Sequence, residues 1–175
     1  MEVTAPRELI DAAVAAEARI ARASALRTDL IDRARRCAEA QGQRVGESRD
    51  VSAWTMAERA RRTVTAELPA AFCIPEITMQ AMIAESDVIM HELPATRSAL
   101  ADDFINYRHA KKSVDHATSL PESAREQFEQ AVIPVALTQT VAKLDRGARV
   151  IRERMHPQSI DERRVSGVER RCIRF

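Results

Sequence analysis

The sequence predicts an all-α protein, a multi-helix bundle with a long N-terminal helix. Hydrophobic residues make up 45% of the 175 residues, but only 3% are aromatic and only four are glycine. The apolar content is therefore mainly alanine, leucine, valine and isoleucine, a composition that favours helices packed on helices. Long stretches without glycine or proline, with apolar residues at helical spacing, point the same way. A short C-terminal strand is expected only at residues 171–175, where Cys172, Ile173 and Phe175 lie close together.

The first helix is expected to start near Thr4, with Pro6 in its first turn, and to run uninterrupted to Gly42. Such a helix is roughly 50 Å long, more than the core of a small domain can cover. Two interpretations follow: the helix packs along a bundle of its own chain, which is preferred, or part of it packs on another subunit. Its larger apolar residues, mostly four or six positions apart, are Ile10, Val14, Ile20, Leu26, Leu30, Ile31 and Cys37.

Residues 41–50 contain two glycines and mixed charges and are predicted to form a connecting loop. Ser52 is then expected to cap a second helix, which Pro69 should kink or end. Along one side of this helix lie Trp54, Ala57, Arg61, Val64 and Leu68.

The rest of the chain is predicted to form shorter helices that begin at prolines or capping residues. Pro75 should open one helix and Pro94 should close it. Further helices are expected over residues 95–101, 106–117 and 121–132, then over Val141 to Ile151 with Thr138 or Thr140 as the cap, and finally from Pro157. The predicted organisation is a long N-terminal helix or arm over residues 1–42, a helical domain over residues 52–170 and the terminal segment 171–175.

The charged residues and cysteines exclude several classes of protein. Lys and Arg total 27 against 26 Asp and Glu, so the whole chain has almost no net field to attract nucleic acid or an anionic membrane. Cys37, Cys73 and Cys172 form no Cys-x-x-Cys pair, so neither a disulfide framework nor a zinc site is predicted. No stretch resembles a signal peptide or a membrane span. We therefore expect a cytoplasmic protein with reduced thiols and no membrane partner.

No catalytic, cofactor-binding or metal-binding residues are predicted. The chain has no Gly-rich phosphate loop, no Gly-x-Ser-x-Gly and no His-Glu-x-x-His. Its four histidines are scattered over predicted helices. His109 and His116, seven residues apart on one helix, are separated by roughly 10 Å and are too distant to share one ion. Histidines with ordinary hydrogen bonds are the preferred interpretation, although Asp102, Asp103 and Asp115 lie near enough in sequence to be considered as ligands.

Residues 65–83 also fit the hydrophobic pattern of a helix-turn-helix, with Cys73 near the turn position that usually holds glycine. Binding to phosphates needs cations, but the second helix carries Glu76, Glu85, Asp87 and Glu92 and has no Lys or Arg before Pro94. A structural helical pair that does not enter a DNA groove is therefore the preferred interpretation.

A basic region occupies the C-terminal third. Arg146, Arg149 and Arg152 recur at intervals of three and could follow a row of phosphates. Asp145 and Glu153 each lie four residues from Arg149, which favours the alternative of a solvated, ion-paired helix face. The candidate nucleic-acid contacts are Lys143, Arg146, Arg149, Arg152, Arg163, Arg164, Arg170 and Arg171.

From about Trp54 onward the chain resembles the 13E12 repeat family, a domain of unknown function that usually precedes an HNH nuclease domain in actinobacterial and phage proteins. Three stretches carry the resemblance: Thr65-Ala-Glu-Leu-Pro-Ala-Ala-Phe72, His91-Glu-Leu-Pro-Ala-Thr-Arg-Ser-Ala-Leu100 and Ile105-Asn-Tyr-Arg-His-Ala110. Leu120-Pro121 and the stretch from Pro157 through the later arginines also look like the family. Asn106 replaces the family's usual Ser, and Asp103 stands where Gly is common.

The resemblance implies a non-catalytic helical accessory domain of an HNH-nuclease-like protein, with DNA as the implied partner of the arginine-rich third. The nuclease motif itself is expected C-terminal to this region and is not found up to Phe175, so the chain is expected to be a fragment or a stand-alone front half. The alternative function, of a different class, is a protein-interaction module that forms a homo-oligomer through the N-terminal helix.

Overall fold

In a computed structural model of the chain, residues 6–48 and 66–157 are described, with side chains for residues 6–40 and 66–157. Within these ranges all regular structure is helical, which confirms the predicted fold class. The helices are α1 (Pro6–Ser48), α3 (Glu76–His91), α4 (Pro94–Ala101), α5 (Tyr107–Ala117), α6 (Glu122–Thr138) and α7 (Val141–Met155). Residues 66–72 are also helical. The predicted strand at 171–175, the Ser52 cap and the helix from Pro157 lie outside the described residues.

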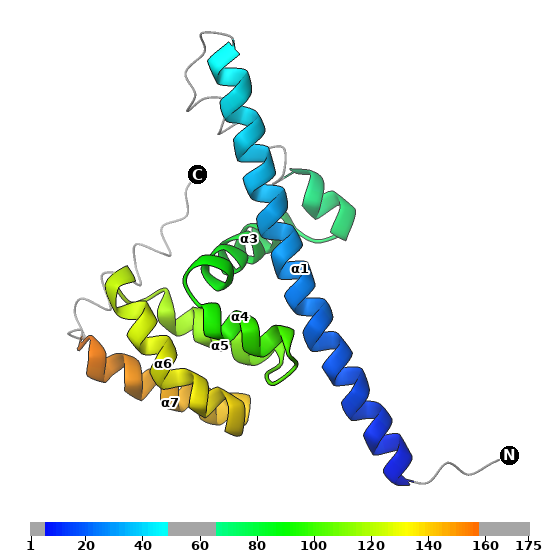
Figure 1. The fold of residues 1–175 in the computed structure, drawn as a ribbon, viewed down its shortest axis with the longest axis vertical. Helices are drawn as coiled ribbons and strands as arrows, with labels where there is room; N and C mark the ends of the chain where they lie inside the picture. The colour runs from blue at the N-terminus through cyan, green and yellow to red at the C-terminus, as the bar shows by residue number, and fades with distance from the viewer. Residues whose placement is uncertain (1–5, 49–65, 158–175) are drawn as a thin grey trace, which may run out of the picture.

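The helices from α3 to α7 pack around one hydrophobic core, and α1 crosses this bundle as a long rod (Figure 1). Phe128, Leu93, Leu100 and Leu144 are fully buried, so α4, α6 and α7 all bring large side chains to the centre. From α1 the small residue Ala21 reaches the core. The bundle is therefore held together mainly by α3 to α7, and α1 packs along its outside.

The N-terminal helix is longer than predicted, since it continues through Gly42 and Gly46 to Ser48. The predicted loop at residues 41–50 is wrong for most of its length. Two glycines cost about 1 kcal/mol each in a helix, but good helix formers surround them here, and no proline follows to stop the helix. At 1.5 Å per residue, the 43 residues of α1 span about 65 Å.

Among residues 6–40 of α1, whose side chains are described, the first three turns do not pack on the bundle. Residues 6–17 are all exposed, and the first buried residue of the helix is Ala21. The preferred interpretation, in which the helix packs along a bundle of its own chain, therefore holds for the middle of α1 and not for its first three turns.

Two other helix boundaries differ from the predictions. Pro94 starts α4 instead of only closing the preceding helix, and α6 runs to Thr138 rather than Val132. Pro134 lies inside α6, where it removes one backbone donor. The helix continues because Val132 and Ala136 on either side of the proline are buried in the core.

The capping predictions have mixed outcomes. Asn106 caps α5 as expected, because its side chain accepts a hydrogen bond from the backbone N–H of His109 at 3.2 Å. Thr140 precedes α7, but its side chain makes no capping hydrogen bond. Thr138 instead donates to the carbonyl oxygen of Pro134 at 2.9 Å.

Two residues adopt positive φ in the described chain, Cys73 at 54° and Asp103 at 56°. This left-handed region favours glycine because a Cβ atom is crowded there. Cys73 ends the helix of residues 66–72, at the turn position that the helix-turn-helix pattern would give to glycine. Asp103 follows α4, at the position where the 13E12 family commonly has glycine. Both positions thus have the backbone conformation that glycine normally supplies.

Candidate functional site

Of the eight predicted nucleic-acid contacts, four lie in the described residues, all on α7. Lys143, Arg146 and Arg149 are exposed, whereas the side chain of Arg152 is 22% exposed. Leu144 and Ala148 on the opposite side of the helix are fully buried. The burial of one side of α7 therefore turns its first three basic residues toward solvent. Arg163, Arg164, Arg170 and Arg171 lie outside the described residues.

The ion pairs predicted for Arg149 do not form. Asp145 instead lies 3.0 Å from His116 Nε2 and 3.4 Å from Lys112 Nζ, both on α5. Glu153 pairs with Arg152 at 2.6 Å. Among the residues whose side chains are described, no salt bridge involves Lys143, Arg146 or Arg149. These three cations, which we call the α7 basic face, are therefore available to an external anion.

His116 and His109 hold α5 against the C-terminal part of the bundle. His116 is buried, and its ring contacts Asp145 and, at 3.4 Å, Arg152. His109 Nε2 lies 3.0 Å from the carbonyl oxygen of Gln139, in the connection between α6 and α7. Each histidine has protein hydrogen-bond partners, in agreement with the preferred interpretation, and neither lies near the other.

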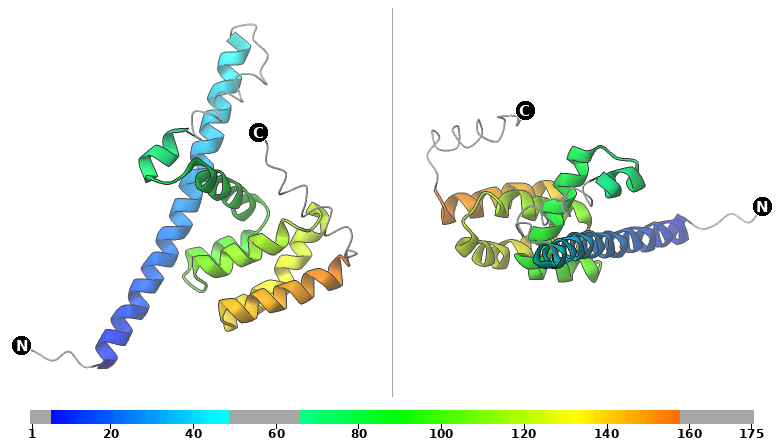
Figure 2. Two further views of the ribbon diagram at one scale, coloured as in Figure 1. Left: turned by 180° about the vertical axis from the view of Figure 1, so that it is seen from behind. Right: turned by 90° about the horizontal axis from the view of Figure 1, so that it is seen from above.

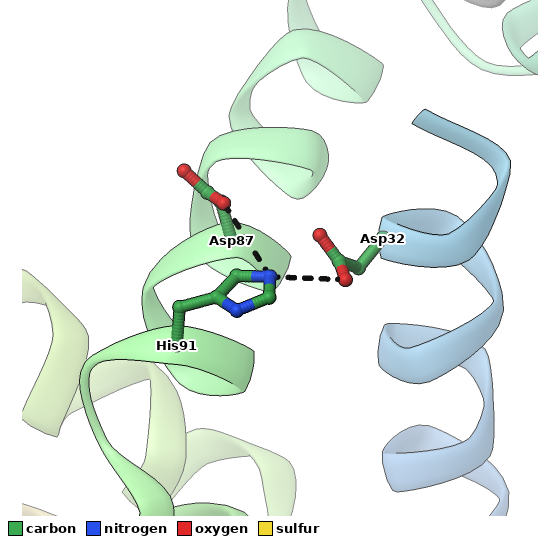
Figure 3. Close-up of side chains that lie close together, drawn as sticks. All are labelled: Asp32, Asp87 and His91. Carbon is green, nitrogen blue, oxygen red and sulfur yellow. Dashed lines mark hydrogen bonds and ion pairs between the residues drawn. The ribbon is translucent and has the colours of Figure 1, made fainter. Parts of the chain in front are cut away.

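The described chain does contain one group of side chains close enough to share a metal ion, and the sequence did not predict it. Asp32 comes from α1, while Asp87 and His91 lie one turn apart on α3, and their ligand atoms are all within 4.8 Å of one another. Figure 3 shows one nitrogen of the His91 ring facing both carboxylates. His91 Nε2 lies 3.1 Å from Asp32 Oδ2 and 3.8 Å from Asp87 Oδ1.

Two arginines of α1 already form salt bridges with these carboxylates. Arg35 Nη2 contacts Asp32 Oδ1 at 2.7 Å and Asp87 Oδ1 at 2.6 Å, and Arg36 Nε contacts Asp32 Oδ2 at 3.1 Å. A divalent cation would have to displace these guanidinium groups or lie beside them, against their repulsion. We therefore interpret the α1–α3 ion cluster, formed by Asp32, Arg35, Arg36, Asp87 and His91, as an interhelical ion-pair network. It joins the long helix to the bundle.

The carboxyls of Asp32 and Asp145 both have lowered pKa values. Burial disfavours the charged form of Asp32, but hydrogen bonds from Arg35 and His91 outweigh it and bring the pKa below its ordinary value. For Asp145 the main cause is the hydrogen bond with His116, and Lys112 adds to it. The folded state therefore favours the ionised form of both carboxyl groups.

Acid should destabilise the chain through these two groups. A carboxyl whose pKa is lowered on folding stabilises the fold fully above its unfolded value, near 3.9, and loses that contribution as the pH falls through the folded value. We expect the free energy of unfolding, measured with urea, to fall as the pH drops from about 5 to 3. The double variant Asp32→Asn/Asp145→Asn should show a smaller fall, and a slope equal to that of the unmodified chain would contradict this assignment.

A groove of about 920 Å³ runs between α1 and the turn before α5. On its walls the guanidinium of Arg27 lies 5.1 Å from the centre of the Tyr107 ring, and Tyr107 donates a 2.5 Å hydrogen bond to Glu85 of α3. Burial and this hydrogen bond raise the pKa of Tyr107. Lys111 also pairs with Glu85. The contacts join α1, α3 and α5 and give this wall of the groove a structural role.

The acidic residues of α3 also form contacts within the bundle. Glu85 pairs with Lys111 and Asp87 with Arg35, and Glu92, which follows the last residue of α3, pairs with Arg125. Because α3 packs against α1, α4 and α5 and uses its carboxylates in this way, the geometry favours a structural helical pair over a recognition helix.

No family model, curated protein or solved structure matches the chain. No helix in the described ranges is long and apolar enough to cross a membrane.

Proposed function

We propose that the chain is a non-catalytic helical accessory domain that binds duplex DNA through the α7 basic face. The observation that carries the proposal is that Lys143, Arg146 and Arg149 lie exposed along one side of a single helix, and none of them forms a salt bridge with a described residue. The resemblance to the 13E12 repeat family supports the choice of DNA as the anion, and we propose that the domain acts in the cytoplasm beside an HNH nuclease domain.

Electrostatic contact with the DNA backbone suits this geometry. The three residues are spaced by three, so their Cα atoms extend over about 9 Å along α7. Duplex DNA carries one negative charge per about 1.7 Å of its axis, so several phosphates lie within that length. The binding expected from such a face is independent of sequence and sensitive to salt.

The full chain should bind a duplex of random sequence. The logarithm of its binding constant should fall linearly with the logarithm of the salt concentration. In the variant Arg146→Glu/Arg149→Glu the affinity at low salt should fall at least tenfold, and the slope should decrease by about 2, because two phosphate contacts are lost. Fluorescence anisotropy with a labelled duplex at several salt concentrations measures both quantities.

A matched control is Arg7→Glu/Arg97→Glu, which changes the net charge equally at two exposed cations of α1 and α4. It should leave most of the affinity and the salt slope in place. No binding at low salt, or equal losses in the two double variants, would contradict a binding face on α7.

A second candidate function, protein interaction through α1, is favoured by a separate observation. Leu9, Ile20, Leu26 and Leu30 are each more than half exposed along this one helix. Apolar surface of this extent on a long helix is typical of a surface that contacts another protein.

A further inference from the structure

The middle of α1 has two different faces. One packs on the bundle and contains Ala21, Ser24, Thr28, Ile31 and Asp32, all buried. The opposite face, which we call the outer seam, consists of residues that alternate three and four positions apart. They are all exposed: Leu9, Ala12, Ala16, Arg19, Ala23, Leu26, Leu30, Arg33 and Cys37.

Alternation of three and four is the spacing by which one α-helix packs on another in a coiled coil. The outer seam extends over four heptads, about 42 Å of helix, and seven of its nine residues are apolar, the exceptions being Arg19 and Arg33. It also continues into residues 6–17, which the bundle leaves exposed. A helical end that lies free in water is only marginally stable, so a second helix along the seam would stabilise it. The seam therefore fits a helix of similar length.

We propose that the occupant is α1 of a second copy of this chain, packed antiparallel. This proposal concerns the interaction function of α1 and does not depend on DNA binding. The seam contains two cations, Arg19 and Arg33. In a parallel pair in register each would face the same arginine of the other copy, and like charges at such positions are destabilising. Antiparallel packing separates them.

One antiparallel register also matches the sizes of the side chains. It places Leu30 opposite Ala12, Leu26 opposite Ala16 and Arg19 opposite Ala23, so that in these three pairs a large side chain faces a small one. In the same register Arg33 lies opposite Leu9, next to Glu8 of the other copy. A two-fold axis relates the two copies, as expected for a homodimer. Each pair therefore occurs twice along the interface, once with each copy supplying the larger residue.

The rest of the molecule leaves room for this partner. In Figures 1 and 2, α4 to α7 lie on one side of α1 and the helix of residues 66–72 lies on the other, while the N-terminal end of α1 extends beyond both. Leu26 and Leu30, near the middle of the outer seam, keep 59% and 51% of their surface exposed. Both bundles would therefore lie on the outside of the helical pair, one on each side.

Sedimentation of the full chain should give a mass of twice 19.5 kDa at high concentration. The variant Leu26→Glu/Leu30→Glu should sediment as a monomer with unchanged helical circular dichroism, because both residues are more than half exposed and neither belongs to the buried core, although Leu26 also borders a pocket between α1, α3 and α4. The control Ile77→Glu/Leu137→Glu adds the same charges at residues of α3 and α6 that are 72% and 46% exposed, and it should remain a dimer. A monomeric unmodified chain, or a dimer that survives Leu26→Glu/Leu30→Glu, would overturn the proposal.

The direction of packing needs a separate measurement. In a chain with its three cysteines replaced by serine, a spin label at Arg7→Cys reports the distance between the two copies. The proposed register places position 7 opposite residue 35 of the other copy, so the two labels should lie about 40 Å apart. A distance under about 20 Å would show parallel packing and overturn this part of the proposal.

Discussion

Replacement of Phe128 by alanine is expected to lower the free energy of unfolding by about 3 to 5 kcal/mol. Phe128 lies on α6, has none of its surface exposed and belongs to the single cluster of buried residues that α3 to α7 share. Its loss removes a large apolar side chain and leaves a cavity that surrounding helices can fill only in part. Urea denaturation followed by circular dichroism measures the effect.

The matched control is Phe104→Ala. Phe104 follows α4 and is 68% exposed, so the same substitution there removes little buried surface and should cost less than about 1 kcal/mol. Equal losses at the two positions would mean that α6 does not pack at the centre of the bundle. A loss at Phe128 under about 1 kcal/mol would have the same meaning.

The helices could be predicted from local features of the sequence, because caps, prolines and apolar spacing act over a few residues. Asn106 and Pro75 mark the starts of α5 and α3 as predicted. The errors occurred where packing or propensity overrode a local signal, as in α6 past Pro134 and in α1 past Gly42. Neither residue stops its helix, because helix formers surround the glycine and buried residues flank the proline.

The α1–α3 ion cluster could not be predicted in the same way. Asp87 and His91 are four residues apart and visibly share a helix face, but Asp32 lies 55 positions before Asp87. Only the crossing of α1 over α3 brings these residues together, and apolar periodicity does not specify such a crossing. The α7 basic face was predicted only in part: helical periodicity separates its cations from the buried Leu144, but the ion-paired face was the preferred interpretation, and Arg152 of the predicted stripe pairs with Glu153.

The second large effect is expected for Asp32→Ala, which should destabilise the fold by about 3 kcal/mol. The side chain of Asp32 is fully buried and contacts Arg35, Arg36 and His91. Without it, the guanidinium of Arg35, whose side chain is only 19% exposed, loses an anionic partner. Removal of one member of a buried ion pair costs about 3–5 kcal/mol, and the low end applies because Arg35 keeps Asp87 and Glu39 as partners and His91 remains 43% exposed to water.

Asp29→Ala provides the comparison on the same helix. Asp29 is 35% exposed and has one salt bridge, 3.5 Å long, to Arg33. An exposed pair of this kind contributes less than about 1 kcal/mol, so its loss should hardly change the urea midpoint. A difference of roughly 2 kcal/mol between the two variants would show that the ion cluster holds α1 against α3. Equal effects would mean that the ion cluster does not hold α1 against α3, and that the apolar contacts of α1 and the contacts of Arg22 and Arg27 attach the long helix instead.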